Sequence, residues 1–568
     1  MEKRTILAFA LSLIVLIGWS ALFGPKNGQL PKKIASKDKQ SVEVSKKDIL
    51  KDRTNDGSDS LHPSQSAVAL NNRNSSGQVQ NMEEKRITID TPLYKAVFTN
   101  RGPGIVSFRL KKYHETTDPL SPLIELVALR KDKWRFITTS FGMQPAYSKA
   151  RDLSAVCRVE SDGDINLQNS GAGFKDLSFV SERLDGLVVR HTFRFYSNTY
   201  TIDYTVDVIN RSGHPVAGKF FTQFNVNLSD KKKDYYSHKG FVLLENNSLE
   251  EVSLKEPGEK KVFTGRIDWC AYEDTYFIRA VIPEKPLHRF FNAAMLGPDL
   301  LSANFFGSDV SVVPAGKVFA VYKLYMGPRD LGILKSVGAD LDRAVNFGWT
   351  DIIAKPLLYS LRLINRYVHN YGISIILLTI LIKIVFWPLS RKSYQSMKEM
   401  QKLQPRMAKI REKYKNDREQ MNKEIMALYK TYKVNPMGGC LPMIIQLPVF
   451  FALYRLLGCA IELRHAPFVL WITDLSAPDR LFHFSFHIPF MTPPYGIPVL
   501  TILMGVSMFV QQKMTPTAGD PTQAKVMLLL PVIFTVMFIN FPSGLVLYWL
   551  FNNIISIIQQ YFIQKRSA

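Results

Sequence analysis

The sequence predicts a polytopic α-helical membrane protein with six transmembrane helices and a large all-β domain outside the membrane. Two observations predict this class. The chain of 568 residues contains six apolar segments, and a long stretch of alternating apolar and polar residues separates the first segment from the second. Several apolar segments are shorter than the roughly 20 residues of an upright span, but flanking apolar residues extend most of them. The segments are residues 6–23, 372–390, 443–460, 497–510, 526–539 and 545–558.

The basic residues of the short loops predict the orientation of these helices. Residues 391–436 contain 13 Lys or Arg against five acidic residues, and Lys and Arg near membrane ends favour the cytoplasm. With this loop inside, the loop near 462–495 is external, whereas the loop near 511–525 and the tail 565–568 are cytoplasmic. Residues 372–390 and 437–564 then supply five membrane helices, and both termini are expected in the cytoplasm.

The first apolar segment, within residues 1–24, is expected to be an uncleaved membrane anchor. The alternative is a cleaved signal peptide, but "ALFGPK" contains no small-x-small cleavage site and no cysteine follows for a lipid anchor. Residues 25–82 are rich in Lys, Ser, Asn and Asp and poor in aromatic residues, so they cannot bury a core. We expect them to form a disordered external linker.

Residues 83–327 are expected to form a β-sandwich. Apolar and polar residues alternate in "LVVRHTFRFYSNTYTIDYTVDVIN" and "KVFAVYKLYMGP", which are rich in Val, Thr, Tyr and Phe. Nothing in this domain indicates catalysis, because its histidines, His191, His214, His238 and His288, are scattered along the sequence.

Residues 328–371 are expected to contain an amphipathic helix. Apolar residues recur at helical spacing among polar ones, with aromatic residues at the start, which is typical of a helix lying along a membrane interface. The alternative is a helix packed on the β domain. The residues of this pattern are Phe347, Trp349, Ile352, Ile353, Leu357, Leu361 and Ile364.

The basic loop 391–436 has a helical pattern of its own, interrupted at "KNDRE", and it predicts a hairpin of two amphipathic helices. This Met-rich, basic hairpin could meet a nascent chain, ribosomal RNA or anionic lipid, or it could simply be a solvated element that sets topology. The apolar positions are Tyr394, Met397, Met400, Leu403, Met407, Ile410 and Tyr414 before the interruption, and Met421, Ile425, Leu428 and Tyr432 after it.

The formal net charge of +23 does not indicate a nucleic-acid-binding protein, because the basic residues divide between the cytoplasmic loop and the region after the first helix. A membrane surface or a ribosome is the favoured acidic partner. Cys157 and Cys270 are external and could pair, whereas Cys440 and Cys459 lie at a membrane helix. None of the four has metal-ligand spacing, so neither a metal nor a cofactor is expected.

Lys383 lies inside the apolar segment 372–390, where a charge costs roughly 2.5 to 3.5 kcal/mol on insertion scales. Its stem could lift the ammonium to the interface near Arg391. Alternatively, Thr379, Lys383 and Trp387 share one helix face and could line a hydrated cavity. This segment by itself leaves both alternatives open.

Several blocks of the membrane region resemble the YidC/Oxa/Alb family of membrane protein insertases, in its Gram-negative form. The resemblance covers essentially the whole chain and is most specific from about residue 354 to 564. The blocks, besides the basic hairpin, are "YKVNPMGGCLPMIIQLPVFFALYRLL", "APFVLWITDLSAPD", "QQKMTPTAGDPTQAKVM" and "PVIFTVMFINFPSGLVLYWLFNNIISIIQQ".

The resemblance implies a periplasmic β-super-sandwich and a five-helix core around a hydrophilic groove with a single positive charge. Lys383 matches that charge, although arginine is usual there, so the planar fork that grips a carboxylate is lost. Thr379 and Trp549 match substrate-proximal groove positions, and Gln512 and Gln446 are weaker candidates. For Gln446, a helix-to-helix hydrogen bond is the preferred interpretation.

The implied function is the insertion and folding of integral membrane proteins in the bacterial inner membrane, alone or with the Sec translocon. The implied partners are nascent membrane proteins, the ribosome, the Sec translocon and anionic lipids, with no small-molecule substrate. New helices would slide into lipid along apolar faces around Phe450, Phe451, Phe534 and Phe538. An alternative is a secondary transporter, but no internal repeat is evident. An enzyme is not expected, because the spans contain no nucleophile beside a base.

Overall fold

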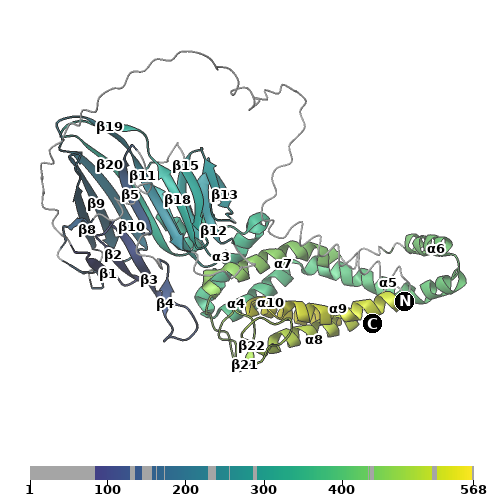
Figure 1. Cartoon of the computed structure of the whole chain (residues 1–568). Helices are drawn as coiled ribbons and strands as arrows, with labels where there is room; N and C mark the ends of the chain where they lie inside the picture. Colours follow the sequence, from purple (N-terminus) through teal and green to yellow (C-terminus); the bar gives the residue numbers. More distant parts are fainter. Residues whose placement is uncertain are drawn as a thin grey trace, which may run out of the picture. The chain divides into compact units, whose positions relative to one another are not determined.

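The computed structural model describes residues 83–127, 135–143, 156–161, 163–169, 171, 173–227, 238–254, 256–285, 291–432, 434, 441–514 and 521–565 (Figure 1). The predicted anchor 1–24, the predicted linker 25–82 and the last three residues lie outside the described residues. Every structural statement below concerns the described part of the chain.

Twenty strands precede the helices. They are β1 (Arg86–Asp90), β2 (Tyr94–Thr99), β3 (Gly104–His114), β4 (Leu123–Glu125), β5 (Ile137–Gly142), β6 (Arg158–Val159), β7 (Ile165–Asn166), β8 (Phe174–Glu182), β9 (Leu187–Tyr196), β10 (Thr201–Asn210), β11 (Val216–Asn227), β12 (Gly240–Glu245), β13 (Ser248–Val252), β14 (Lys260–Phe263), β15 (Ile267–Glu273), β16 (Phe277–Pro283), β17 (Phe291–Gly297), β18 (Leu300–Phe306), β19 (Val310–Val312) and β20 (Lys317–Pro328).

These strands form three sheets. The largest has nine strands in the order β13-β12-β15-β16-β20-β10-β9-β8-β6. A six-stranded sheet has the order β14-β17-β18-β11-β19, with β5 paired to β11, and a five-stranded sheet has the order β4-β3-β2-β1-β7. Almost every pairing is antiparallel; the described exception is the short parallel pair of β1 and β7.

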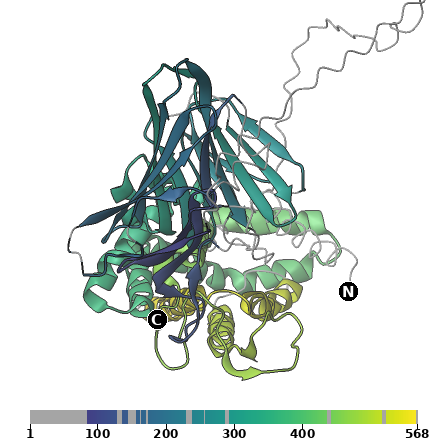
Figure 2. The same cartoon turned by 60° about the vertical axis from the view of Figure 1, so that its left-hand side comes forward.

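Both smaller sheets cover one face of the nine-stranded sheet (Figures 1 and 2). Tyr204 of β10 lies between its cross-strand neighbours Phe193 and Tyr322, so these three side chains share a face. Phe98 of the five-stranded sheet packs on Phe193 with ring centroids 4.9 Å apart. Thr222 of the six-stranded sheet donates to the Tyr322 hydroxyl at 2.7 Å. The alternation along β10, in which every second residue is buried, follows from this one-sided cover.

The β domain buries both of its cysteines as free thiols. Cys157 and Cys270 are unpaired, and burial raises the pKa of each thiol. The pairing that the sequence left open is therefore absent, and the apolar core rather than a disulfide holds these strands together.

Helices follow the last strand. They are α2 (Leu331–Val337), η3 (Leu341–Ala344), η4 (Gly348–Thr350), α3 (Asp351–Val368), α4 (Tyr371–Val385), α5 (Trp387–Lys413), α6 (Arg418–Thr431), α7 (Leu441–Cys459), η6 (Ile461–Leu463), α8 (Val499–Met514), α9 (Pro521–Phe538) and α10 (Ser543–Lys565), with a hairpin of β21 (Leu481–Phe484) and β22 (Tyr495–Ile497) before α8.

By length and composition, one described helix, Ser543–Ile563, is long and apolar enough to cross a membrane by itself. The pair α4 and α5 passes the same criterion together, with a bend of 65° between its halves. Shorter apolar helices run over Gln446–Cys459, Val499–Met514 and Met527–Phe538.

The bend corrects one detail of the sequence interpretation. The helix of the apolar segment 372–390 ends at Val385, and α5 starts at Trp387 with Pro388 in its first turn. Proline is favoured in a first turn, because its missing N–H would be unpaired there in any case. Trp387 therefore does not continue the face of Thr379 and Lys383, as a straight helix would require.

The basic hairpin consists of α5 and α6 with its own small core. Met400, Leu403 and Met407 of α5 are buried together with Val434, and Leu428 and Tyr429 of α6 pack against them. Most of the charged residues remain outside this core.

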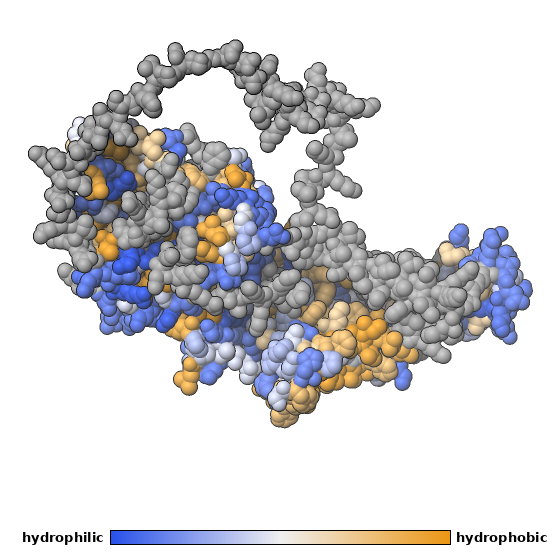
Figure 3. Space-filling model, viewed as in Figure 1, coloured by the Kyte–Doolittle hydropathy of each residue, from blue (hydrophilic) through white to orange (hydrophobic). Residues whose placement is uncertain are grey.

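Apolar side chains are exposed along α4, α8 and α9, far beyond the scattered apolar exposure of a soluble protein. In Figure 3 an orange area covers this part of the helical region. These surfaces need an apolar solvent. The exposed residues include Ile373, Leu377, Ile380, Leu381 and Ile384 of α4; Ile502, Leu503, Val506 and Phe509 of α8; and Leu528, Leu529, Val532, Val536 and Met537 of α9.

Candidate functional site: a polar seam along the last helix

Lys383 lies inside the helical bundle. Its side chain is 8% exposed, and its Nζ donates to Ser556 Oγ of α10 at 2.7 Å. The Ser556 hydroxyl in turn donates to the Asn552 carbonyl at 2.7 Å. No carboxylate within the described ranges forms an ion pair with Lys383. The ammonium therefore points between α4 and α10 rather than toward a helix end, and its charge has no counter-ion there.

Ser556 belongs to a row of polar side chains on one face of α10. The row steps by three and four residues, which places its members on one helix face, and most of them are buried. Asn553 donates to Ser507 of α8 at 3.0 Å, and Gln560 donates to the Met514 carbonyl at 2.6 Å. We call this row, together with Lys383 and Gln446, the polar seam; its members on α10 are Asn552, Asn553, Ser556, Gln559 and Gln560.

The seam contains hydrogen-bonding capacity that the described residues do not use. Gln559 Oε1 and Gln560 Oε1 of the seam are buried without a partner, and so is Nε1 of Trp549, which lies next to the seam. Buried polar atoms in native proteins nearly always have a partner, such as protein or water. These three atoms therefore mark places where water or a polar group of a ligand would be stabilised.

Gln446 connects α7 to this seam. Its Nε2 donates to Asn552 Oδ1 at 2.6 Å and to the Tyr548 hydroxyl at 3.2 Å. Both contacts are helix-to-helix hydrogen bonds, and they join α7 to α10.

Thr379 is one turn before Lys383 and is almost completely buried. Its hydroxyl donates to the Ile375 carbonyl of its own helix at 2.7 Å. In this conformation the Thr379 hydroxyl proton is used within α4, and only the acceptor capacity of its oxygen remains.

Trp549 lies on the α10 face that also carries Ser556, two turns earlier, within an aromatic cluster. Its ring centroid is 4.7 Å from Phe450 of α7 and 5.3 Å from Phe538 of α9. Phe538 is fully buried. The sliding surface that the sequence interpretation placed around Phe538 therefore does not include this residue, because its neighbours on α7, α9 and α10 cover it.

Gln512 is separate from the other candidates. It lies near the end of α8, is half-buried, and its Nε2 contacts Met527 Sδ of α9 at 3.6 Å. The structure thus brings Lys383 and Gln446 together through α10, but places Gln512 at the α8–α9 contact.

A second basic side chain, Arg455, lies within an apolar helix but outside the polar seam, so the expectation of a single positive charge in the groove is unaffected. Arg455 of α7 is half-buried, one turn before the helix ends at Cys459. It packs over Gly348, where a Cβ would lie 2.6 Å from Nη1 of the arginine. Gly348 also has a φ of 62°, which favours glycine. The positive φ and the close approach of Arg455 therefore both disfavour a side chain at this position. Arg455 therefore serves the contact with η4 and is not part of the polar seam.

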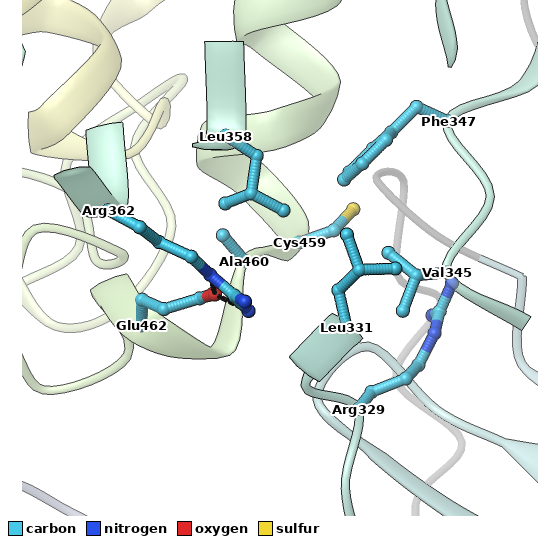
Figure 4. A pocket seen from close by; sticks show the side chains of 9 residues that line it. All are labelled: Arg329, Leu331, Val345, Phe347, Leu358, Arg362, Cys459, Ala460 and Glu462. Carbon is cyan, nitrogen blue, oxygen red and sulfur yellow. Dashed lines mark hydrogen bonds and ion pairs between the residues drawn. The ribbon is translucent and has the colours of Figure 1, made fainter. Parts of the chain in front are cut away.

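A small pocket lies apart from the seam, where the segment after β20 meets α3 and the end of α7 (Figure 4). Arg362 of α3 donates to Glu462 Oε1 at 2.5 Å and to Asp330 Oδ2 at 2.9 Å. Burial raises the pKa of the Glu462 carboxyl, and Arg362 opposes this effect. The pocket is lined by Arg329, Leu331, Val345, Phe347, Leu358, Arg362, Cys459, Ala460 and Glu462.

The sequence interpretation missed most of the polar seam. Trp549 was identified, but the polar stripe in "NNIISIIQQ" directly after it was not. The signal was present, because polar residues at a spacing of three and four in an apolar helix indicate an interior face. The junction of Arg362, Asp330 and Glu462 was missed as well, and its members are too far apart in sequence for any local pattern.

The seam can bind through hydrogen bonds and charge, but it is not equipped for covalent chemistry. Its members are amides, a hydroxyl and an ammonium. In the described parts of the chain, no group of three or more His, Cys, Asp or Glu residues could hold a metal ion.

A large β domain joined to a helical bundle with apolar flanks, a buried cation and a polar seam is typical of a membrane protein with a polar interior. Family models match both parts: the one described as 60Kd inner membrane protein matches residues 363–568, and the one described as YidC periplasmic domain matches residues 86–360.

Known relatives match over the whole length. The membrane protein insertase YidC of Syntrophus aciditrophicus (strain SB) is 43% identical and covers 100% of both chains. The insertase of the same name from Pelobacter propionicus is 40% identical over 100% of this chain and 99% of its own. The chain therefore belongs to the YidC family of membrane protein insertases. A crystal structure of an active YidC insertase with its first transmembrane domain resolved aligns with 85% of this chain and 93% of its own, at 19% identity and a TM-score of 0.37.

Proposed function

We propose that this chain inserts integral membrane proteins into the inner membrane and assists their folding, with the polar seam as the surface that receives the polar flank of a client. One observation carries the proposal. Lys383 is buried between α4 and α10 without a carboxylate, α10 also carries buried polar atoms that lack partners, and the outer surface of the bundle is apolar.

The mechanism needs no covalent step. A client helix gains free energy when its apolar surface leaves water, whereas its polar flank loses hydration while it crosses hydrocarbon. Amides and a hydroxyl along α10 replace part of that hydration, and the Lys383 ammonium attracts an acidic flank. The exposed apolar surfaces of α4, α8 and α9 border the lipid that the client helix enters. The short apolar helices add to the effect, because a locally thin bilayer shortens the crossing.

We propose six transmembrane helices with both termini in the cytoplasm and the β domain in the periplasm. The six comprise the first apolar segment, α4 with the start of α5, α7, α8, α9 and α10. The apolar parts of α7, α8 and α9 are shorter than a full upright span, so the proposal depends on a thinned bilayer or on flanking residues that snorkel. The basic loop between α5 and α7 supports its orientation.

The partners would contact different parts of the chain. The basic hairpin of α5 and α6 would meet anionic lipid and the ribosome, because its charged residues lie outside its small apolar core. Nascent membrane proteins would contact the polar seam. We include the Sec translocon as a further partner.

Site-specific crosslinking tests the proposal. A photoreactive residue replaces Trp549, next to the seam, or Ile502, on the exposed face of α8, and ribosome-stalled nascent membrane proteins are supplied to membranes with each variant. We expect nascent chains of increasing length to crosslink to position 549 before they crosslink to position 502. Crosslinks that never form at 549 would refute the role of the seam. Solute uptake by vesicles that contain the purified protein would instead favour the transporter alternative.

A further inference from the structure

The β21–β22 hairpin exposes aromatic side chains, among them those of His483 and His487, and contains no carboxylate, Lys or Arg. From Leu481 to Pro498 the sequence contains no Asp, Glu, Lys or Arg. Phe482, Phe486 and Phe490 are 67%, 62% and 81% exposed. A loop in water would be expected to carry charged residues, so this hairpin has the composition of a surface that water does not cover.

The base of the hairpin is held firmly against the helical bundle. Arg480 donates to the Pro494 carbonyl at 2.9 Å and to the Ile539 carbonyl at 2.8 Å. Asn540, in the turn between α9 and α10, donates to the Phe490 carbonyl at 2.8 Å and accepts from the Thr492 amide at 2.8 Å. These bonds span the hairpin and the α9–α10 turn, so the exposed rings stay at a fixed height relative to the helix ends.

Two of the three exposed rings are on strained backbone. Phe482 has a φ of 54° and Phe490 a φ of 63°, in the left-handed region that favours Gly and Asn. Phenylalanine there costs conformational energy, and its exposed ring gains little packing within the chain. The strain indicates that these aromatic rings have a use outside the chain.

The neighbours of the hairpin identify what covers it. The hairpin lies between the end of α7 at Cys459 and the start of α8 at Val499, and its base contacts the α9–α10 turn. Immediately beyond it in the sequence, α8 exposes Ile502 and Leu503, which belong to the apolar surface of the helices. Aromatic residues are favoured at the level where membrane helices leave the hydrocarbon.

We propose that the β21–β22 hairpin inserts Phe482, Phe486 and Phe490 into the interfacial layer of the external leaflet, and so sets the depth of the external ends of α8, α9 and α10. The proposal rests on the membrane placement of α8 proposed above. The lack of Asp, Glu, Lys and Arg favours lipid over a protein partner. The aromatic surface of the hairpin adjoins the apolar surface of α8, which is proposed to face hydrocarbon.

Fluorine NMR on the full chain tests the proposal. Trifluoromethyl-phenylalanine replaces Phe490, and the protein is placed as one copy per nanodisc of phosphatidylcholine and phosphatidylglycerol. Two paramagnetic probes are compared: a phosphatidylcholine with a doxyl group near its headgroup, and a water-soluble gadolinium chelate. We expect the doxyl lipid to broaden the signal at 490 at least threefold more than at Leu184, an exposed residue of the β domain, and the chelate to do the reverse.

A probe at Ile502 distinguishes failure of the hairpin proposal from failure of the membrane placement of α8. Broadening by lipid at 502 but not at 490 overturns the hairpin proposal and leaves α8 in the membrane. Absence of lipid broadening at both positions overturns both. If the hairpin instead binds a second copy of the chain or a client segment, the ring at 490 faces water in these discs, because each disc contains one copy and no client. The doxyl lipid would then leave the signal at 490 unbroadened, and the proposal would be overturned.

A triple variant, F482N/F486N/F490N, gives an independent measurement. Asn suits left-handed backbone, so we expect the unfolding temperature in detergent to be unchanged or higher. Protease cleavage within 481–498 should be at least tenfold slower in nanodiscs than in detergent for the parent chain, but within twofold for the variant. Equal protection of variant and parent in nanodiscs would overturn the proposal.

Discussion

Replacement of Lys383 separates charge from hydration in the polar seam. Lys383→Gln removes the charge but keeps a polar amide, Lys383→Met keeps length and removes polarity, and Lys383→Arg keeps the charge. Ser556→Ala is the matched control, because it removes only the hydroxyl that accepts from Nζ at 2.7 Å. We expect Lys383→Gln to impair clients with acidic translocated tails most and Lys383→Arg to support them.

The expected size follows from the position of the ammonium. Two unit charges about 4 Å apart attract by about 4 kcal/mol at an effective dielectric constant near 20. Lys383 is already buried at 8% exposure, so its own dehydration precedes client binding, but a client carboxylate must still lose water. If half or more of the attraction is offset, about 1 to 2 kcal/mol remains, which corresponds to about 5- to 30-fold. Ser556→Ala removes a charge-assisted hydrogen bond, which contributes about 1.5 to 3 kcal/mol, but it keeps the ammonium, so its cost should not depend on the charge of the tail.

The assay is protease protection of two clients that differ only in the charge of the translocated tail. Each variant is expressed at a matched level in cells depleted of the parent protein. The predicted pattern is a partial defect for the acidic tail with Lys383→Gln and a smaller defect for the neutral tail. If Lys383→Gln and Lys383→Met reduce the translocation of the acidic and the neutral tail equally, the side chain acts through hydration or packing, and charge attraction is refuted.

Three further predictions concern topology, the α3 junction and pH. Cysteines at the exposed positions Lys423 and Leu470 should react with impermeant maleimide only from the cytoplasmic and only from the periplasmic side, respectively, and the opposite labelling would reject the proposed orientation. Arg362→Ala should lower the free energy of unfolding by about 3 to 5 kcal/mol, because it leaves the buried Glu462 carboxylate unpaired. Calorimetry should show that adding Glu462→Gln to the same chain restores part of the lost stability. If no stability is restored, the ion pair is not the cause. Burial raises the pKa of Glu273 to about 7 from 4.5, so the folded state retains a proton that the unfolded state releases. The stability from this group is complete below pH 4.5 and falls by about 3 kcal/mol as the pH rises to 7. Urea titrations at several pH values should show a smaller fall in the free energy of unfolding for Glu273→Gln.

Patterns of short range could be read directly from the sequence. A strand with one buried face must alternate, so the alternation of "TIDYTVDVIN" indicated β10 before its partners were known. The spacing of Met400, Leu403 and Met407 likewise indicated the inward face of the basic hairpin. In each case the signal lies within ten residues, because the period of one helix or strand is a local property.

The direction of the Lys383 side chain could not be predicted from its own helix. Thr379 and Lys383 share a face, but the same face could meet lipid, water or another helix. Its hydrogen-bond partner, Ser556, is 173 residues away on α10. The bend after Val385 also removed Trp387 from that face.

The sequence by itself determined which segments are apolar, which alternate, and where positive charge gathers, because these properties depend on residue type and local spacing. Only the tertiary structure decided that Phe538 is covered, that Arg362 joins Asp330 and Glu462, and that the aromatic hairpin is held against the α9–α10 turn. The two contacts of Arg362, for example, connect residues 32 and 100 positions apart. Their formation depends on how several elements pack at once, and local residue patterns do not encode that packing geometry.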